Sequence, residues 1–171
     1  VAIETSLDAE KLDAYKPRQI IDAIVEDLTT HFERKAKAIA ETVRPTMQRI
    51  YEDRKDQMDM RIAFPLTDGR LRYSIPVELQ KCKDSDCAEI YRVFAKVVLF
   101  TTIDDAWREH LREMDELRQS VQNAQYEQKD PLLIYKLESY NLFSKMLQKV
   151  NRESLAILNK AFIPVRENNP E

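Results

Sequence analysis

The sequence contains one glycine, Gly69, in 171 residues, and this scarcity excludes several classes of protein. Loops that hold nucleotide phosphates need two or more glycines at fixed spacing, because their backbone turns tightly and approaches the ligand closely. Neither G-x-x-x-x-G-K-[ST] nor G-x-G-x-x-G can be built around a single glycine. These residues are therefore not expected to bind a nucleotide cofactor or to hydrolyse ATP.

Long hydrophobic runs and an excess of positive charge are also lacking. There is no stretch of 18 apolar residues, so no transmembrane helix is expected. The start has no basic segment followed by an apolar core, so no signal peptide is expected. A net charge of −3 gives no reason to expect nucleic acid binding. The first residue, Val1, indicates a segment of a longer protein.

Cysteine is nearly absent, since only Cys82 and Cys87 occur. Together they would supply half of a zinc site, and His31 and His110 lie far away in the sequence at no ligand-like spacing. A metal site is therefore not expected. The pattern favours two reduced thiols in a cytosolic loop.

What the sequence has is charge and helical periodicity. Charged residues make up 33% of the chain, and a glycine-poor, charge-rich composition suits long solvated helices. From Ile90 onwards, apolar residues recur at steps of three and four, which places them on one side of a helix. The first arm carries Ile90, Val93, Phe94, Val97, Val98, Trp107, Leu111, Met114, Leu117 and Val121. The second carries Leu133, Leu137, Tyr140, Phe143, Met146, Leu147, Val150, Leu155 and Leu158.

A polar loop at residues 122–131 separates the two arms. It ends in Asp130-Pro131, and this pair favours a new helix because Asp is a good N-cap and Pro suits the first helical position. A short connection between long helices makes them antiparallel neighbours. The sequence thus predicts a helical hairpin over residues 90–163, roughly 45 Å long at about 1.5 Å per residue, and a polar tail at 164–171.

Residues 1–89 predict a separate helical subdomain. A helix starts at Lys16-Pro17, and Pro45 should break or kink it. A β-hairpin is expected at about 61–77, because Asp68-Gly69 separates two alternating apolar runs. A lone hairpin is marginal in water, so it must pack on the helices. The expected packing residues are Ile62, Phe64, Tyr73 and Ile75. Residues 78–89 predict a charged linker, and the fold class is mostly α with one small β-hairpin.

The first arm carries side chains that need two interpretations. His110 lies five residues after Asp105, which is not the spacing of a pair on one helix face, and no nucleophile accompanies it, so catalysis is not expected. Trp107 lies on the apolar stripe and is expected in the core. The acidic residues from Asp104 to Glu116, interrupted by arginines, predict a solvated face, with a docking surface as the alternative.

Three strings in the two arms closely resemble one family. They are Thr-Thr-Ile-Asp-Asp-Ala-Trp-Arg-Glu-His-Leu at 101–111, Met-Asp-Glu-Leu-Arg-Gln at 114–119 and Tyr-Glu-Gln-Lys-Asp-Pro at 126–131. The resemblance is to the scaffold region of SecA, the ATPase that drives preproteins through the SecY channel. It is dense from Ile90 to Pro164. Residues 31–41 also resemble the helical wing of that family, so residues 1–89 would be wing-like.

The resemblance implies roles for particular residues. The 90–163 hairpin would contain the two-helix finger, with Tyr126 placed against the translocating chain and Gln128 and Lys129 gripping nearby backbone or channel loops. Trp107, His110 and Asp105 would belong to the scaffold contact with other domains. Without the resemblance, Tyr126 would be expected to fold back onto the helix ends. A tyrosine suits a contact independent of substrate sequence, because it offers apolar area and a hydroxyl at low entropy cost.

The resemblance also implies partners and a location. The partners would be the SecY channel, the unfolded preprotein and other SecA domains, with no nucleic acid. The protein would be cytoplasmic and peripheral on the cytoplasmic face of the inner membrane. ATP and magnesium would bind only in motor domains outside these residues. The alternative from another class is a standalone helical-hairpin adaptor that binds partner helices.

Two features depart from the simplest family pattern. Residues 42–89, which include the hairpin, are extra relative to some members, and their role stays open. The long scaffold helix that precedes the wing in the family has no counterpart in residues 1–16. An apolar seam is therefore expected to stay exposed along the helical hairpin. It would be covered by self-association, by the wing or by lattice neighbours. The residues expected there are Val97, Phe100, Ile103, Leu142 and Met146.

Overall fold

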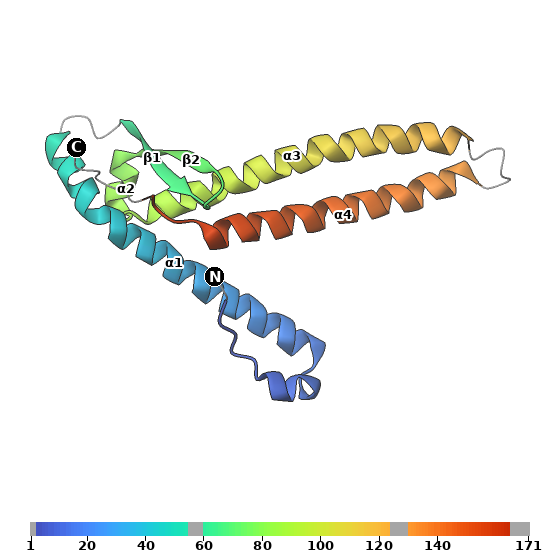
Figure 1. The fold of residues 1–171 in the computed structure, drawn as a ribbon, viewed down its shortest axis with the longest axis horizontal. Helices are drawn as coiled ribbons and strands as arrows, with labels where there is room; N and C mark the ends of the chain where they lie inside the picture. The colour runs from blue at the N-terminus through green and yellow to red at the C-terminus, as the bar shows by residue number, and fades with distance from the viewer. Residues whose placement is uncertain (1–2, 55–59, 124–129, 165–171) are drawn as a thin grey trace. The chain divides into compact units, whose positions relative to one another are not determined.

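The elements follow the sequence patterns closely in a computed structural model, which describes residues 3–54, 60–123 and 130–164. A 3-10 helix, η1 (Ala9–Ala14), precedes the helix α1 (Pro17–Asp53) and the strands β1 (Arg61–Thr67) and β2 (Arg72–Glu78). The helices α2 (Leu79–Asp84), α3 (Ala88–Asn123) and α4 (Pro131–Lys160) follow (Figure 1). The predicted fold class, mostly α with one small β-hairpin, is confirmed.

Helix α1 begins where the sequence predicts, with Pro17 at its first position and the Lys16 amide donating to Gln19 Oε1 at 2.9 Å. The sequence predicted a break or a kink at Pro45. A break is wrong, because α1 continues through this residue to Asp53. Proline removes one backbone hydrogen bond of the helix. Val43 and Met47, on either side of Pro45, are both fully buried, so packing on both sides of Pro45 helps to keep the helix continuous.

The β-hairpin is antiparallel, with Phe64 opposite Ile75 and Leu66 opposite Tyr73. Because side chains alternate along a strand, one face carries the large apolar residues. On that face Phe64, Leu66, Ile75 and Val77 are buried, and Ile62 and Tyr73 are half-buried. The sequence prediction identified the correct face but omitted Leu66 and Val77. Pro65 and Pro76 are exposed, as expected for residues that cannot donate to the ladder.

Two features near the hairpin were not predicted. Residues 78–89 are not simply a linker, because Leu79–Asp84 form the helix α2, whose Leu79 and Cys82 are fully buried. Past the end of α4, Phe162 pairs with Thr67 as an isolated bridge. The Thr67 amide donates to the Phe162 carbonyl at 3.0 Å, and the Phe162 amide donates to the Thr67 carbonyl at 2.8 Å.

The chain divides into two compact units. The first, here called the β-hairpin unit, comprises Val1–Phe94 and Asn159–Glu171, and the second, the two-helix unit, comprises Ala95–Leu158. The sequence predicted a boundary between two domains at residues 89 and 90. These compact units are not a test of separate domains, so that boundary stays a prediction.

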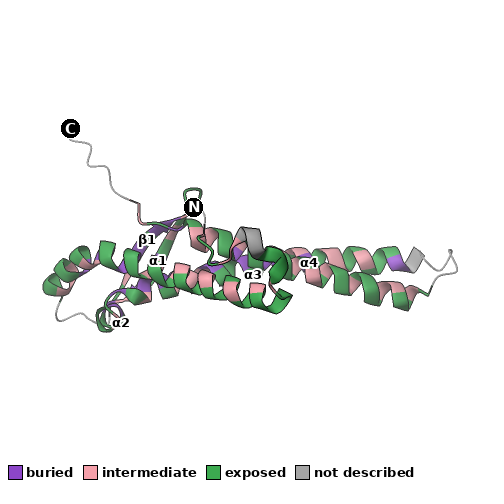
Figure 2. Cartoon of the chain, turned by 90° about the horizontal axis from the view of Figure 1, so that it is seen from below, coloured by how far each residue is buried: buried purple, intermediate pink, exposed green. Residues whose placement is uncertain are grey.

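The core lies mainly in the β-hairpin unit. Figure 2 shows buried residues at β1 and near α2, whereas α4 carries mostly exposed and intermediate residues. The largest fully buried side chains of the β-hairpin unit are Met47, Leu66, Ile75, Leu79, Ile90 and Phe94. Buried apolar area is the main stabilising contribution in folding, so this unit supplies most of the chain's hydrophobic stabilisation.

Candidate functional site

The end of the two-helix unit is the first candidate site. Helix α3 ends at Asn123 and α4 begins at Pro131, at the same end of the unit (Figure 1). Asp130 caps α4 as predicted, because its Oδ1 accepts the Leu132 amide at 2.9 Å. The predicted contact residues Tyr126, Gln128 and Lys129 lie outside the described residues. The structure therefore places the two helix ends that carry their loop and does not test their roles.

Polar and aromatic contacts fix the pairing of α3 with α4. The hydroxyls of Thr102 and Ser154 are buried and lie 2.7 Å apart. Eight residues further along α3, the His110 ring packs edge-on against Phe143, with centroids 5.9 Å apart. From the first contact to the second, the residue number rises along α3 and falls along α4. The two helices are therefore antiparallel, as the short loop predicts.

The three predicted scaffold-contact residues differ in burial. His110 is buried, and its Nδ1 has no hydrogen-bond partner in the described part of the chain. Asp105 is exposed and lies 3.7 Å from Arg108. The expectation of a core position for Trp107 is wrong, because its side chain is 45% exposed, although its ring lies 5.5 Å from that of His110, centroid to centroid. The role of these residues in contacting other domains stays a prediction.

An apolar stripe is exposed on α3, and we define it as Phe100, Ile103, Trp107 and Leu111. Phe100 is 74% exposed, which is unusual for so large an apolar side chain. Helix α4 also exposes Leu133, Leu137, Tyr140, Phe143 and Leu147. The predicted exposure of Phe100 and Ile103 is confirmed, whereas Val97, Leu142 and Met146 are half-buried between the helices.

The acidic run on α3 is a solvated face in this chain. Asp104 pairs with Arg108 and Glu109 with Arg112, at spacings of four and three residues. All four side chains are more than 40% exposed, and exposed pairs of this kind contribute little to stability.

Within the described residues, no helix is long and apolar enough to cross a membrane.

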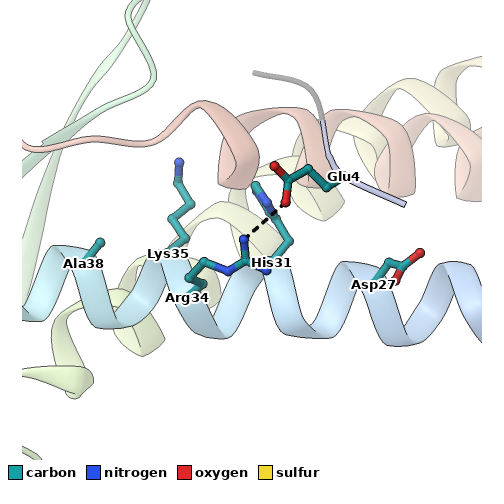
Figure 3. A pocket seen from close by; sticks show the side chains of 6 residues that line it. All are labelled: Glu4, Asp27, His31, Arg34, Lys35 and Ala38. Carbon is teal, nitrogen blue, oxygen red and sulfur yellow. Dashed lines mark ion pairs between the residues drawn. The ribbon is translucent and has the colours of Figure 1, made fainter. Parts of the chain in front are cut away.

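A cavity of about 310 Å³ beside α1 has no counterpart in the sequence analysis (Figure 3). It is lined by Glu4, Asp27, His31, Arg34, Lys35 and Ala38. Arg34 Nη1 lies 3.6 Å from Glu4 Oε2, and the Ser6 amide donates to Asp27 Oδ2 at 2.8 Å. This backbone donor lowers the pKa of Asp27, although partial burial opposes the shift.

Two of the lining side chains, His31 and Lys35, contact Asn159 near the end of α4. Lys35 Nζ donates to the Asn159 carbonyl at 2.7 Å, and His31 Nε2 contacts Asn159 Oδ1 at 2.8 Å. Burial lowers the pKa of Lys35. The charged lining groups thus already have protein partners, and those partners lie up to 128 residues away in the sequence. No local motif could have revealed this cavity.

Possible metal ligands are few. Among the described residues, no group of three or more His, Cys, Asp or Glu side chains is arranged to hold a metal ion. Cys82 and Cys87 are free and buried. The predicted loop position holds for Cys87, which lies in the turn after α2, whereas Cys82 lies in α2 itself.

These features define a mostly α protein in which a compact unit with a β-hairpin is joined to a long antiparallel helix pair. The family model described as "SecA Wing and Scaffold domain" matches residues 2–161, so the chain belongs to the SecA family. The match includes residues 42–89, which the sequence analysis left as an extra segment.

Relatives named as SecA proteins match nearly the whole chain. "Protein translocase subunit SecA" of Parabacteroides distasonis is 41% identical over 170 residues, 99% of this chain and 15% of the relative. The protein of that name from Porphyromonas gingivalis strain W83 is 44% identical over 167 residues, 98% of this chain and 15% of the relative. The chain thus spans about 15% of the length of these relatives. No solved structure matches it.

Proposed function

We propose that this chain is the wing and scaffold part of a protein-translocating ATPase, and that its two-helix unit is the finger that contacts preprotein at the SecY channel. The family match over residues 2–161 carries this proposal. Its support in the fold is the antiparallel pair α3 and α4, which holds residues 124–130 between two helix ends.

Tyr126 is the proposed contact with the preprotein. The contact must accept many sequences, and a tyrosine offers an apolar ring and a hydroxyl with few rotatable bonds. Gln128 and Lys129 add donors for backbone carbonyls or for acidic channel loops. The Asp130 cap, which accepts the Leu132 amide, would fix the position from which this loop emerges.

Transmission of motion requires a stiff element. Helices of 36 and 30 residues are about 54 and 45 Å long at about 1.5 Å per residue. Sliding of α3 along α4 would separate the buried hydroxyls of Thr102 and Ser154, and an unpaired buried polar group is unfavourable by about 1–3 kcal/mol. The pair can therefore move as one body.

The ATP-hydrolysing domains would lie outside these residues. ATP and magnesium would bind in motor domains elsewhere in the full-length protein, and the protein would act from the cytoplasm at the inner membrane surface. Trp107, His110 and Asp105 would contact those other domains. The exposure of Trp107 and Asp105 supports such a contact.

The decisive experiment is Tyr126→Ala in the full-length translocase that carries this chain, with preprotein transport into membrane vesicles as the readout. Transport should fall by at least tenfold, while the free energy of unfolding changes by no more than about 0.5 kcal/mol. Tyr126→Phe should retain part of the transport because it keeps the ring. Ser120→Ala, an exposed polar change on the last turns of α3, is the matched control. Transport equal to wild type in Tyr126→Ala would refute the finger role.

A helical adaptor is the second candidate, and the exposed apolar stripe favours it. An adaptor would bind partner helices through residues such as Phe100 and would not need the loop residue Tyr126. It therefore predicts loss of function in Phe100→Ser and no effect in Tyr126→Ala. Calorimetry of the isolated chain with ATP is a separate check, and specific binding at micromolar concentration would contradict the placement of the motor elsewhere.

A further inference from the structure

The C-terminal cap of α2 brings the two cysteines of the chain together. The Cys87 amide donates to the Cys82 carbonyl at 2.7 Å, and the Asp86 amide donates to the Lys83 carbonyl at 3.1 Å. Asp86 has φ of 49°, in the left-handed region. These two backbone hydrogen bonds, together with a left-handed residue, define the Schellman cap. In this motif the residues at its two ends contact each other. Here those two residues are Cys82 and Cys87.

The thiols are shielded by packing from α1. The side chains of Cys82 and Cys87 are 0% and 2% exposed, and neither is in a disulfide. The Tyr51 hydroxyl of α1 is buried beside both thiols. From the same helix, Arg44 Nε donates to Asp86 Oδ1 at 2.9 Å, which holds the left-handed residue of the cap in place.

Cys87 itself is held in an unfavourable backbone conformation. Its φ of 69° lies in the left-handed region, which a residue with a Cβ rarely adopts. Such a conformation persists only where the surrounding structure determines it, and it often marks a functional position. Packing of two small apolar side chains would not need a strained backbone at the second one.

We propose that Cys82 and Cys87 are a reversible redox pair, which closes an intramolecular disulfide across the cap of α2 by exchange with a low-molecular-weight disulfide such as oxidised glutathione. In the first step, one cysteine thiolate attacks a glutathione sulfur, forms a mixed disulfide and releases one glutathione thiolate. In the second, the other cysteine loses its proton and attacks the mixed disulfide at the protein sulfur, and the second glutathione leaves. Two thiols of the protein are oxidised and one glutathione disulfide is reduced.

Burial sets the rate of this exchange. Burial raises the pKa of the Cys82 thiol to about 12, so this thiol is protonated near neutral pH and reacts slowly. Exchange requires local opening of α2, which has only six residues and is therefore a candidate for low local stability. Closure would join the end of α2 to the residue just before α3, which begins at Ala88.

The test is a redox titration of the chain. Samples equilibrate at a series of ratios of oxidised to reduced glutathione, and free thiols are alkylated under denaturing conditions before intact mass is measured. The expected product has lost two hydrogens, carries no alkyl group and returns to the doubly alkylated form after dithiothreitol treatment. The rate of its formation should rise several-fold in urea below the unfolding transition.

Single cysteine variants are the controls. Cys82→Ala and Cys87→Ala should form only a mixed disulfide, whose intact mass is raised by one glutathione, and neither should give the product that has lost two hydrogens. The wild-type series decides the question even if a variant does not fold. Double alkylation of wild type at every ratio, a persistent glutathione adduct at equilibrium, or only intermolecular disulfides would each overturn the proposal.

Discussion

Single residues decide the geometry of the turn between β1 and β2. Gly69 has φ of 88°, which side chains with a Cβ rarely adopt. Asp68 Oδ1 accepts the amides of Arg70 and Leu71 at 2.9 and 2.7 Å, so the turn is also closed by a side chain. A Cβ on residue 69 would meet Phe162 Cε1 at 3.9 Å, an ordinary contact, so only the backbone conformation opposes substitution.

Gly69→Ala should therefore reduce the free energy of unfolding by about 1–2 kcal/mol, the difference for a left-handed residue with a Cβ. Urea denaturation followed by circular dichroism measures this. Arg70→Ala, at the neighbouring exposed position, should change it by no more than about 0.5 kcal/mol. Equal stability of Gly69→Ala and wild type would show that the turn relaxes to another conformation.

Asp86 gives the stability of the chain a predictable pH dependence. Its hydrogen bond from Arg44 lowers the pKa of the Asp86 carboxyl in the folded chain. The stabilisation is present above the unfolded pKa of about 3.9 and is lost as the pH falls through the lower folded value. Asp86→Asn should thus be less stable than wild type at pH 7, and the two should converge in strong acid.

Asparagine is the informative replacement, because it tolerates the left-handed conformation and removes only the charge. Urea midpoints over a pH series measure the difference, with the exposed Asp22→Asn as the control. The difference should shrink in high salt, since the Asp86 side chain is 71% exposed and that of Arg44 39%. A difference that stays constant from neutral to strongly acidic pH would contradict the assignment.

At the scale of elements, α3 changes character along its length. Phe94 is fully buried in the β-hairpin unit and packs edge-on against Tyr73, with ring centroids 5.3 Å apart. Six residues later, Phe100 is 74% exposed in the two-helix unit. One helix thus contributes a core side chain in one unit and an uncovered one in the other.

Phe94 and Phe100 allow the same substitution to be compared at a buried and at an exposed position of α3. Phe94→Ala should destabilise the chain by about 3–5 kcal/mol, because it removes a buried ring and leaves a cavity. Phe100→Ala should change stability by no more than about 0.5 kcal/mol. Thermal and urea unfolding measure both. A large loss in Phe100→Ala would mean that the ring is covered in solution.

At the scale of the whole molecule, exposed apolar area is the dominant property of the two-helix unit. Within the apolar stripe of α3, and among the exposed apolar residues of α4, neighbouring members are three or four residues apart. Each set therefore lies along one side of its helix. Soluble monomers rarely leave large contiguous apolar patches uncovered. The isolated chain should therefore bind a dye for apolar surface and increase in mean mass with concentration.

The double variant Phe100→Ser with Ile103→Ser should lower both signals, because it removes two members of the apolar stripe. Thr101→Ser, an exposed polar change between them, should leave both unchanged. Light scattering over a concentration series and dye fluorescence provide the two measurements. A monomeric chain that binds no dye would show that the stripe is covered within the chain, against the exposure described above.

The sequence by itself determined the elements whose signals are local. The Asp68-Gly69 pair gave the hairpin, Asp130-Pro131 gave the start of α4, and steps of three and four gave the long helices. The strings at 101–111 and 126–131 also identified the family, which the match over residues 2–161 confirmed. These features depend on residues close together in the chain, so a sequence pattern contains them.

Only the tertiary structure decided which apolar residues are covered. Periodicity placed Trp107 and Phe94 on one stripe, but burial needs a facing element. Among the residues that the structure describes, α3 is covered at Phe94 and left partly uncovered at Trp107. The same reason explains α1, where packing of Val43 and Met47 keeps the helix intact through Pro45. The bridge from Thr67 to Phe162, the contacts of Asn159 and the shielding of the thiols by Tyr51 join residues far apart in sequence. No local pattern encodes such contacts, because they exist only after the chain has folded.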